Sequence, residues 1–487
     1  MTIFRATQRA LIAATFLTLW LNGTGASAQL QTPPGPPQTP SANENFIVTF
    51  RPGTSQTDRA ASVRRAGAAL RFNYSIVDAV AVTANVNAIG ALQRDITVLE
   101  IIPDRPVRAF QAGQGNGNAR KPGGGGGGGG GGSTPQAAPE GVKRVGVPTA
   151  GSDGSGIGVA IIDTGIDFNH PDLQGALNDS SFSAFGGSCQ DDNQHGTHVA
   201  GIVGARDNTI DVVGVAPNAT LYCVKVLNAA GSGSDSDVMA GLDWVAVTDG
   251  LIDQDGACAN QPANLPIRVV NMSLGRQGTL IDNSALRASI QCLHNHGVAV
   301  VVAAGNDSSK EVSQMIPAGY PEVLAVASAT AITGSNAGCR FFSGTIPADT
   351  ASYFTTDGAF DDPLGSGIGV TISAPGADKE DVSKSCFIKS VGILSLKLGG
   401  GTTRLSGTSM ASPHVAGIVA RMIQTGNYDP PVGQAGPFGY LVEDVRTDIR
   451  LNADRNESDP DPAPLHSPAS GYTFDGEQEG IAQAPAL

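Results

Sequence analysis

The sequence lacks the spacings that are typical of a zinc site. It has six cysteines, but no two of them form a CxxC pattern, which many structural zinc sites use. His195 and His198 lie three residues apart, as a metal pair on one helix face would, but no HExxH segment accompanies them. We therefore interpret His198, like His170 and His414, as a structural residue.

Basic residues are scarce after the first part of the chain. The 487 residues include 30 Lys and Arg and 44 Asp and Glu, and residues 1–134 hold 12 of the former but only 6 of the latter. The remainder therefore carries 18 positive and 38 negative side chains. Such an acidic balance argues against a nucleic-acid partner and favours solubility outside the cell.

Long apolar runs are absent except near the N-terminus. Two arginines precede an apolar run at residues 10–21, and small residues follow it as far as Ala28. This layout predicts a signal peptide over residues 1–28, with cleavage before Gln29. The alternative, a membrane anchor, is disfavoured because the run is short and a cleavage site follows it. We expect a secreted protein, extracellular or periplasmic, with no membrane contact after cleavage.

Export would place the cysteines in an oxidising compartment, where an even number favours disulfide bonds. Six cysteines allow 15 pairings, which the sequence does not distinguish; we favour sequential pairing. All of them lie beyond a Gly-rich spacer, at Cys189, Cys223, Cys258, Cys292, Cys339 and Cys386.

Composition divides the rest of the chain into five parts. Residues 29–44, rich in Pro and Gln, form a flexible lead-in, and residues 45–110 form a small α+β unit. A linker at residues 111–134 includes ten consecutive glycines and should be random coil. Residues 135–454 form the main domain, and residues 455–487 form an acidic, Pro-containing tail with few apolar residues to pack against a core.

In the small unit at residues 45–110 we expect strands at residues 46–50, 76–84 and 98–103, a helix through Arg64 and a second helix at 88–94.

In the main domain, apolar β-type runs alternate with helical stretches. Continuous apolar strands separated by helices predict a mainly parallel sheet covered on both faces, which is a three-layer α/β fold. Polar and Gly-rich residues 343–366 interrupt the pattern, and we expect them to form a surface insertion. The expected strands are residues 158–163, 221–227, 267–274, 298–305 and 324–329.

Three short segments carry the chemistry. They are AIIDTGID at residues 160–167, HGTHVAG at 195–201 and GTSMASPHVAG at 407–417. In this order they resemble the subtilisin-like serine protease family over roughly residues 45–450. The resemblance implies a subtilisin-like fold and a serine endopeptidase that needs no catalytic cofactor.

The residue types explain how these segments could cut a peptide bond. A serine hydroxyl needs a base to take its proton, and histidine titrates near neutral pH. We expect Ser409 as nucleophile, His195 as base, and Asp163 as the carboxylate that fixes the imidazole tautomer. Pro413 fits only a first helical turn and would place Ser409 near a helix N-terminus. Asn306 matches the family's oxyanion asparagine, with the Ser409 backbone N–H as second donor. Taken singly, these residues are more often caps or turns, but their joint occurrence favours catalysis.

The resemblance also implies a substrate cleft. Two segments match those between which the family holds an extended peptide as an added strand, and a third matches a pocket wall. The alternative is that they are ordinary Gly-containing loops. No acidic residue in the third segment indicates basic specificity, so we expect a broad or apolar preference. The residues are Gly231, Ser232, Gly233, Ser273, Leu274, Gly275, Ala303, Ala304 and Gly305.

A structural calcium site is a further implication of the resemblance. The family's site uses an N-terminal glutamine, an aspartate after the first catalytic segment, and a loop before a Gly-Val-Ala-Pro run, and such oxygen ligands suit Ca²⁺. Arg206 stands where an apolar residue is commoner in the family. The matching ligands are the side chains of Gln136, Asp172 and Asn208 and the carbonyls of Arg206, Ile210 and Val212.

The unit at residues 45–110 resembles the family's inhibitory prodomain, a ferredoxin-like α+β fold whose C-terminal strand lies in the active site. We expect Phe110 in the cleft, self-cleavage after it, and a monomeric enzyme that acts on proteins or peptides. The polyglycine linker departs from the family, which joins the two parts without a long spacer. Two other interpretations stay open: a non-catalytic binding or surface protein, and a specialised processing protease of the same family.

Overall fold

A computed structural model describes most of the chain. The predicted signal peptide, the lead-in, nearly all of the Gly-rich linker and most of the tail lie outside the described residues. The structure describes residues 43–110, 134–147, 151–253, 258, 265–358, 369–426, 442–454 and 479–485.

Residues 43–110 form an antiparallel sheet with strand order β2-β3-β1-β4 and two helices. The βαββαβ order is that of a ferredoxin-like unit. Its small core includes Val48, Val80 and Leu92. Helix α1 begins where Ser55 accepts a hydrogen bond from Asp58 N–H, which is an N-cap. The elements are β1 (Glu44–Phe50), α1 (Gln56–Ala66), β2 (Ala69–Asn73), β3 (Ala79–Ala84), α2 (Val86–Leu92), β4 (Val98–Pro103) and β5 (Pro106–Ala109).

The main domain is built on a seven-stranded sheet of order β15-β14-β12-β10-β6-β8-β7, in which all neighbouring pairs are parallel. The prediction of an α/β fold with a mainly parallel sheet is confirmed. The strands are β6 (Gly158–Asp163), β7 (Leu177–Ser183), β8 (Thr220–Lys225), β10 (Val269–Met272), β12 (Ala299–Ala303), β14 (Leu324–Thr330) and β15 (Ile372–Ala377).

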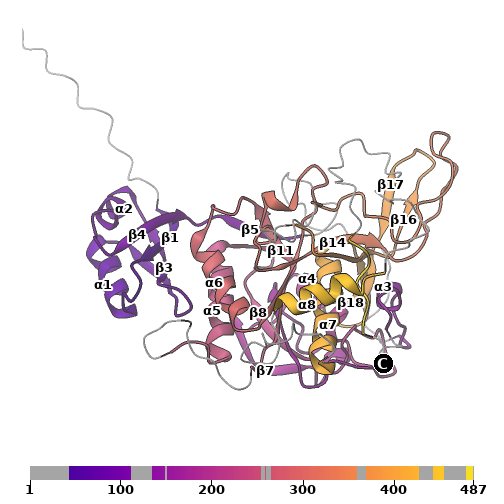
Figure 1. Cartoon of the computed structure of the whole chain (residues 1–487), viewed down its shortest axis with the longest axis horizontal. Helices are drawn as coiled ribbons and strands as arrows, with labels where there is room; N and C mark the ends of the chain where they lie inside the picture. The colour runs from indigo at the N-terminus through magenta and orange to yellow at the C-terminus, as the bar shows by residue number, and fades with distance from the viewer. Residues whose placement is uncertain are drawn as a thin grey trace, which may run out of the picture. The chain divides into compact units, whose positions relative to one another are not determined.

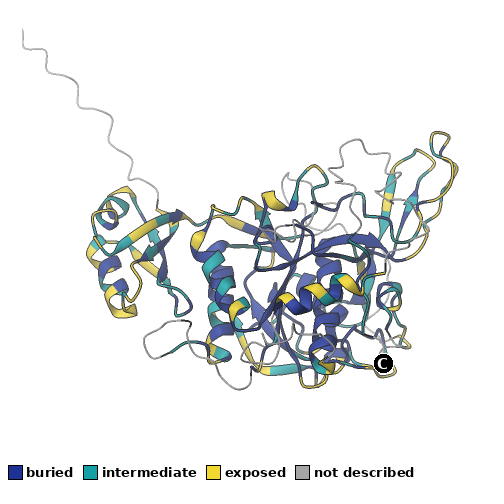
Figure 2. Ribbon diagram, viewed as in Figure 1, coloured by how far each residue is buried: buried dark blue, intermediate teal, exposed yellow. Residues whose placement is uncertain are grey.

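Helices cover both faces of this sheet (Figure 1). Successive residues of β6 point to opposite faces: Ile161 belongs to the core layer under α4 and α7, and Ile162 to the layer under α5 and α6. Because both faces are apolar, the strands read as continuous apolar runs. Figure 2 shows the buried sheet between these two helix layers. The covering helices are α4 (His195–Gly204), α5 (Asp235–Thr248), α6 (Ser284–Asn295) and α7 (Thr408–Thr425).

Smaller elements surround the sheet. Strand β5 of the first unit joins β9, β11 and β13 in a second sheet, and β16–β17 and β18–β19 form hairpins. Among the described residues, no helix combines the length and apolar character needed to cross a bilayer. These elements are α3 (Glu140–Arg144), η1 (Pro171–Leu173), β9 (Ser232–Ser234), β11 (Leu274–Gln277), η2 (Val312–Gln314), β13 (Met315–Ile316), β16 (Lys379–Val382), β17 (Ile388–Val391), β18 (Ile393–Leu396), β19 (Thr402–Leu405) and α8 (Val442–Leu451).

Two expectations from the sequence need correction. Residues 343–366 were expected to form a surface insertion, of which 359–366 lie outside the described residues. In the described part, Ser352 and Thr356 are fully buried, with their hydroxyls bonded to Ser328 and to the backbone of Asp307. The tail was expected to be loosely held, but residues 479–485 are docked: Ile481 pairs with Ser373 and Asp454.

The cysteines pair sequentially, as favoured from the sequence. The disulfides are Cys189–Cys223, Cys258–Cys292 and Cys339–Cys386, so that no described cysteine is free.

Candidate active site

Asp163 and His195 meet at the carboxyl edge of the large sheet. Asp163 is the last residue of β6, and His195 is the first residue of α4. The imidazole Nδ1 lies 2.8 Å and 3.0 Å from the two carboxylate oxygens of Asp163, and both side chains are buried. The carboxylate therefore favours the tautomer with the proton on Nδ1. The other ring nitrogen, Nε2, is buried and has no hydrogen-bond partner among the described residues.

Asp191, which the sequence analysis missed, holds the loops of both residues. Its Oδ1 accepts a hydrogen bond from the hydroxyl of Thr164, which directly follows Asp163. Its Oδ2 accepts from the backbone N–H and hydroxyl of Thr197 in the first turn of α4. Asp191 precedes the start of α4 by four residues, and aspartate favours positions near helix N-termini.

Ser409 is the second residue of α7 and is fully buried. The helix follows Gly407, whose φ of 152° and ψ of 165° are restricted to glycine. The Ser409 hydroxyl donates to the carbonyl oxygen of Ser273 at 2.9 Å. The nucleophile predicted from the sequence thus lies at a helix N-terminus, where backbone amides favour negative charge.

Pro413 lies deeper in α7 than the sequence predicted. It is the sixth residue of the helix rather than part of its first turn. Because proline has no N–H, it leaves the carbonyl of Ser409, four residues earlier, without its helical donor. The Ser273 hydroxyl donates to this carbonyl at 2.9 Å. Ser273 and Ser409 therefore exchange two hydrogen bonds.

Asn306 faces the start of the same helix. Its Oδ1 accepts hydrogen bonds from the backbone N–H and the hydroxyl of Thr408, each at 2.9 Å. Its Nδ2 is buried without a partner among the described residues. An amide donor that is both oriented and unused is what an oxyanion requires.

The two predicted peptide-binding segments flank β5. Val107 in β5 pairs with Gly233 in β9, and Ala109 pairs with Leu274 in β11, both antiparallel. The backbone N–H of Ala109 also donates to the carbonyl of Gly231. Residues 231–233 and 273–275 therefore hold an extended segment of this chain as a middle strand.

Phe110 follows this strand and lies beside Ser273 and the predicted nucleophile, Ser409. Its N–H donates to the carbonyl of Ser273 at 3.3 Å, the same oxygen that accepts from the Ser409 hydroxyl. A Cβ placed on Gly275 would come within 2.7 Å of the Phe110 ring, so glycine is required for the ring to lie there.

Residues 303–305, expected as a pocket wall, connect β12 to Asn306, and their contact with a substrate stays a prediction.

The residues predicted for calcium also come together. Burial raises the pKa of Asp172 to about 7, even though Asn208 Nδ2 and Val212 N–H donate to its carboxylate. Gln136 Nε2 lies 2.9 Å from the carbonyl of Arg206 and 3.5 Å from that of Val212. Turning this amide by 180° would place its oxygen beside the same carbonyls, which is the ligand chemistry of Ca²⁺. Ile210 lies alongside, pairing with Pro135. Asn208 Oδ1 accepts from Ile210 N–H while its Nδ2 faces Asp172, so this amide would also have to turn to act as a ligand. A calcium ion here, which would compensate the buried carboxylate, stays a prediction.

The three histidines interpreted as structural are buried among backbone groups. His170 Nε2 lies 3.0 Å from the carbonyl of Gly401. His198 Nε2 lies 3.0 Å from that of Ile393, and His414 Nδ1 lies 2.8 Å from that of Met410. Burial lowers the pKa of His198 to about 3 and that of His414 to about 4, so both are neutral.

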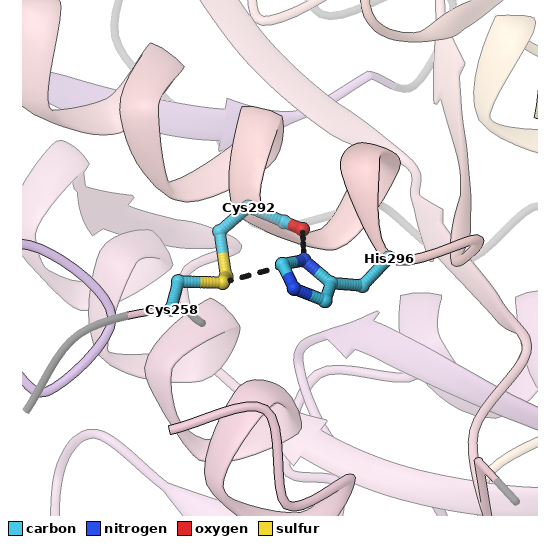
Figure 3. A group of neighbouring side chains, drawn as sticks. All are labelled: Cys258, Cys292 and His296. Carbon is cyan, nitrogen blue, oxygen red and sulfur yellow. Dashed lines mark hydrogen bonds between the residues drawn. A yellow bond between two sulfur atoms is a disulfide. The ribbon is translucent and has the colours of Figure 1, made fainter. Parts of the chain in front are cut away.

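One cysteine–histidine group has the composition of a metal site but not its chemistry. Figure 3 shows His296 beside the Cys258–Cys292 disulfide, with its Nδ1 3.6 Å from Cys258 Sγ and 2.7 Å from the Cys292 carbonyl. Metal binding needs thiolates, and both sulfurs are bonded to each other.

The chain is similar in sequence to a known family and to its members. A sequence model described as "Subtilase family" matches residues 154–461. The chain is 36% identical over 292 residues to an alkaline protease of Alkalihalobacillus alcalophilus, which covers 59% of this chain and 60% of the relative. It is 29% identical over 391 residues to subtilisin amylosacchariticus of Bacillus subtilis subsp. amylosacchariticus, covering 79% of this chain and 81% of the relative.

A similar fold occurs in the crystal structure of fervidolysin from Fervidobacterium pennivorans, a keratinolytic enzyme related to subtilisin. The TM-score is 0.59 at 20% identity, and the match covers 91% of this chain and 60% of that one. At this identity the likeness concerns the fold alone.

Proposed function

The chain belongs to the subtilase family, and we propose that it is a secreted, monomeric serine endopeptidase that is made as a precursor and cleaves itself after Phe110. The observation that carries this proposal is the hydrogen bond of Phe110 N–H to the Ser273 carbonyl, which also accepts the Ser409 hydroxyl. The end of the first unit thus lies as a cleaved substrate would, against the nucleophile.

In the proposed reaction the Ser409 hydroxyl turns from Ser273 toward His195 Nε2. Oγ attacks the carbonyl carbon of the peptide bond while its proton passes to Nε2, and Asp163 stabilises the imidazolium through Nδ1–H. The oxyanion accepts hydrogen bonds from Asn306 Nδ2 and the Ser409 N–H. Nε2 then protonates the leaving amine, which leaves an acyl-enzyme that water hydrolyses by the same route. General acid–base catalysis of this kind contributes about 10²–10⁴-fold in rate.

A substrate would replace β5 as the middle strand between β9 and β11. Main-chain hydrogen bonds of this kind do not depend on the substrate's sequence, so selectivity comes from the sites that bind its side chains. The cleft holds two apolar side chains: Val107 within β5, which is buried, and Phe110 directly after β5, which is half-buried. A broad or apolar preference follows.

Residues 45–110 would act as an intramolecular inhibitor. Arg71 forms ion pairs with Asp104 in its own unit and with Asp237 in α5. The N–H groups of Ser75 and Ile76 donate to Asp243 in α5, each at 2.6 Å. These contacts lie outside the cleft, so the unit can stay bound after the chain is cut.

A calcium ion would stabilise the loop that connects α4 to β8. Its ligands would be the side chains of Gln136, Asp172 and Asn208 and the carbonyls of Arg206, Ile210 and Val212. It would take no part in the reaction. Its role is to compensate a buried charge and to fix the segment that follows the linker.

Two buried polar atoms without a hydrogen-bond partner argue against a non-catalytic binding protein. His195 Nε2 and Asn306 Nδ2 are buried and unpaired among the described residues, and each such atom costs about 1–3 kcal/mol. A catalyst uses both in the transition state, whereas a binding protein would gain from losing them. A specialised processing protease would share this site and differ only in its substrate.

Digestion of a soluble protein such as casein, together with labelling by a sulfonyl fluoride, tests the proposal. We expect digestion by the wild type, a label on Ser409, and neither with Ser409→Ala. Labelling elsewhere, or digestion that survives Ser409→Ala in a purified sample, would contradict the assignment.

A further inference from the structure

Two exposed phenylalanines lie on a disulfide-linked projection of the main domain. Phe341 is 86% exposed and Phe387 is 74% exposed. They follow Cys339 and Cys386, which are bonded to each other with Cα atoms 5.0 Å apart. We call residues 335–346 and 382–389 the disulfide lobe. Figure 1 shows the adjoining strands β16 and β17 extending from the body of the domain, and Figure 2 shows exposed residues along this projection.

The lobe is internally fixed, so this exposure is built into the fold. Cys339, Ile346 and Val382 form a small core of their own. Asn336 uses its amide fully: Nδ2 donates to the carbonyls of Phe342 and Gly344, and Oδ1 accepts from the N–H groups of Gly338 and Cys339. The two aromatic rings are therefore held in water by a rigid scaffold, which is costly without a partner.

The charge of the lobe is opposite to that of the chain. Its two segments contain Arg340, Lys384 and Lys389, all exposed, and no Asp or Glu. Asp381, at the edge of the lobe, accepts hydrogen bonds from Ser335 and is paired with Lys379, so these two neighbours add no net charge. The chain as a whole has a net charge of −14. At physiological salt the Debye length is about 8 Å, so on a projecting lobe the local cations would outweigh the more distant acidic surface.

In place of the expectation of no membrane contact after cleavage, we propose that the disulfide lobe binds the surface of an anionic lipid bilayer. Phe341 and Phe387 enter the headgroup region, and Arg340, Lys384 and Lys389 lie beside lipid phosphates. Aromatic rings with flanking cations are suited to this boundary, where apolar atoms leave water and long basic side chains reach the phosphates. A protein partner of ordinary affinity would need about 800 Å² on each side, a broader surface than two rings at a narrow projection offer.

Sedimentation with vesicles tests this proposal on the full chain carrying Ser409→Ala, so that the result does not depend on peptidase activity. We expect the protein to sediment with vesicles of phosphatidylcholine and phosphatidylglycerol at 3:1 and not with pure phosphatidylcholine. Each of Arg340→Gln, Lys384→Gln and Lys389→Gln should weaken binding by about fivefold. Phe341→Ser with Phe387→Ser should weaken it by at least about tenfold.

Phe185→Ser is the matched control, because Phe185 is 47% exposed and lies outside the lobe; it should leave binding unchanged. Equal binding to neutral and anionic vesicles, no binding by the parent protein, or full binding by the double Phe variant would overturn the proposal. A dimer in solution that the double variant dissociates, without vesicle binding, would assign the lobe to a second copy of this chain and also overturn it. If the double variant fails to fold, the three charge variants decide the question alone.

Discussion

Asn306 and Thr408 are joined by two hydrogen bonds, both accepted by the Asn306 carbonyl oxygen, Oδ1. This pairing fixes which end of the amide is available, because Oδ1 is occupied and Nδ2 is not paired with any described residue. It also ties the Asn306 loop to the first residue of α7, so that both proposed oxyanion donors belong to one rigid unit.

Replacing Asn306 by Ala should lower kcat by about 100–1000-fold and change KM little, because the lost donor acts only on the transition state. Thr408→Val is the companion variant: it removes the hydroxyl, which donates to Asn306 and accepts from Gly305 N–H, and keeps the backbone bond to Asn306. We expect it to cost about tenfold or less. Steady-state hydrolysis of a soluble peptide measures both. A loss below about threefold for Asn306→Ala would remove this residue from the oxyanion site.

Arg71→Ala should release the cleaved first unit sooner. Arg71 contacts Ser236 and Asp237 of the main domain as well as Asp104 of its own unit. Losing one member of such a charge pair typically costs 2 kcal/mol or more, about thirtyfold in affinity. The measurement is whether the cleaved unit copurifies with the enzyme. Arg65→Ala is the control, because the Arg65 side chain is 68% exposed and pairs with Asp95 in its own unit; it should leave copurification unchanged.

Removing calcium should lower the melting temperature. An ion present at about 100 times its Kd stabilises a protein by about 2.7 kcal/mol, which is a shift of several degrees. Asp172→Asn should abolish the response to a chelator, and Asp179→Asn, at an exposed carboxylate later in the sequence, should keep it. An unchanged melting temperature of the wild type in chelator would refute the site.

Glu380 should make stability depend on pH. Burial raises its pKa from 4.5 to about 7, so the folded protein binds this proton more tightly than the unfolded chain. Its contribution to the free energy of unfolding therefore falls as pH rises from about 4.5 to about 7, by about 3 kcal/mol in total.

Glu380→Gln can keep the hydrogen bonds that Tyr353 N–H and the Ser390 hydroxyl donate to Oε1. In chains carrying Ser409→Ala, we expect this variant to melt above its parent at pH 8 and to show no gain at pH 4.5. A constant difference between the two proteins over this range would contradict the assignment.

The buried parallel strands could be predicted because both of their faces are apolar, as Ile161 and Ile162 show. The edge strands could not. β7 is LNDSSFS and β15 is ISAPGA, with Pro375 inside it, so neither has the apolar run that marked the central strands. In the first unit, β2 was missed because ALRFN is short and partly exposed.

At the candidate site, the ordered motifs predicted which side chains react but not which residues position them. Asp191 acts through contacts with Thr164 and Thr197, which are distant from one another in the sequence. The exchange between Ser273 and Ser409 depends on Pro413 freeing a carbonyl inside a helix. Such relations appear only when the segments are packed together.

The measurement that tests the central claim most directly is the N-terminus of the processed chain, in the wild type and in Ser409→Ala expressed identically as full precursors. If Ser409 cleaves after Phe110, the wild type begins at Gln111 or further along the linker, and the variant stays uncut. Identical processing of both proteins, or a wild type that is never cut, would contradict the claim.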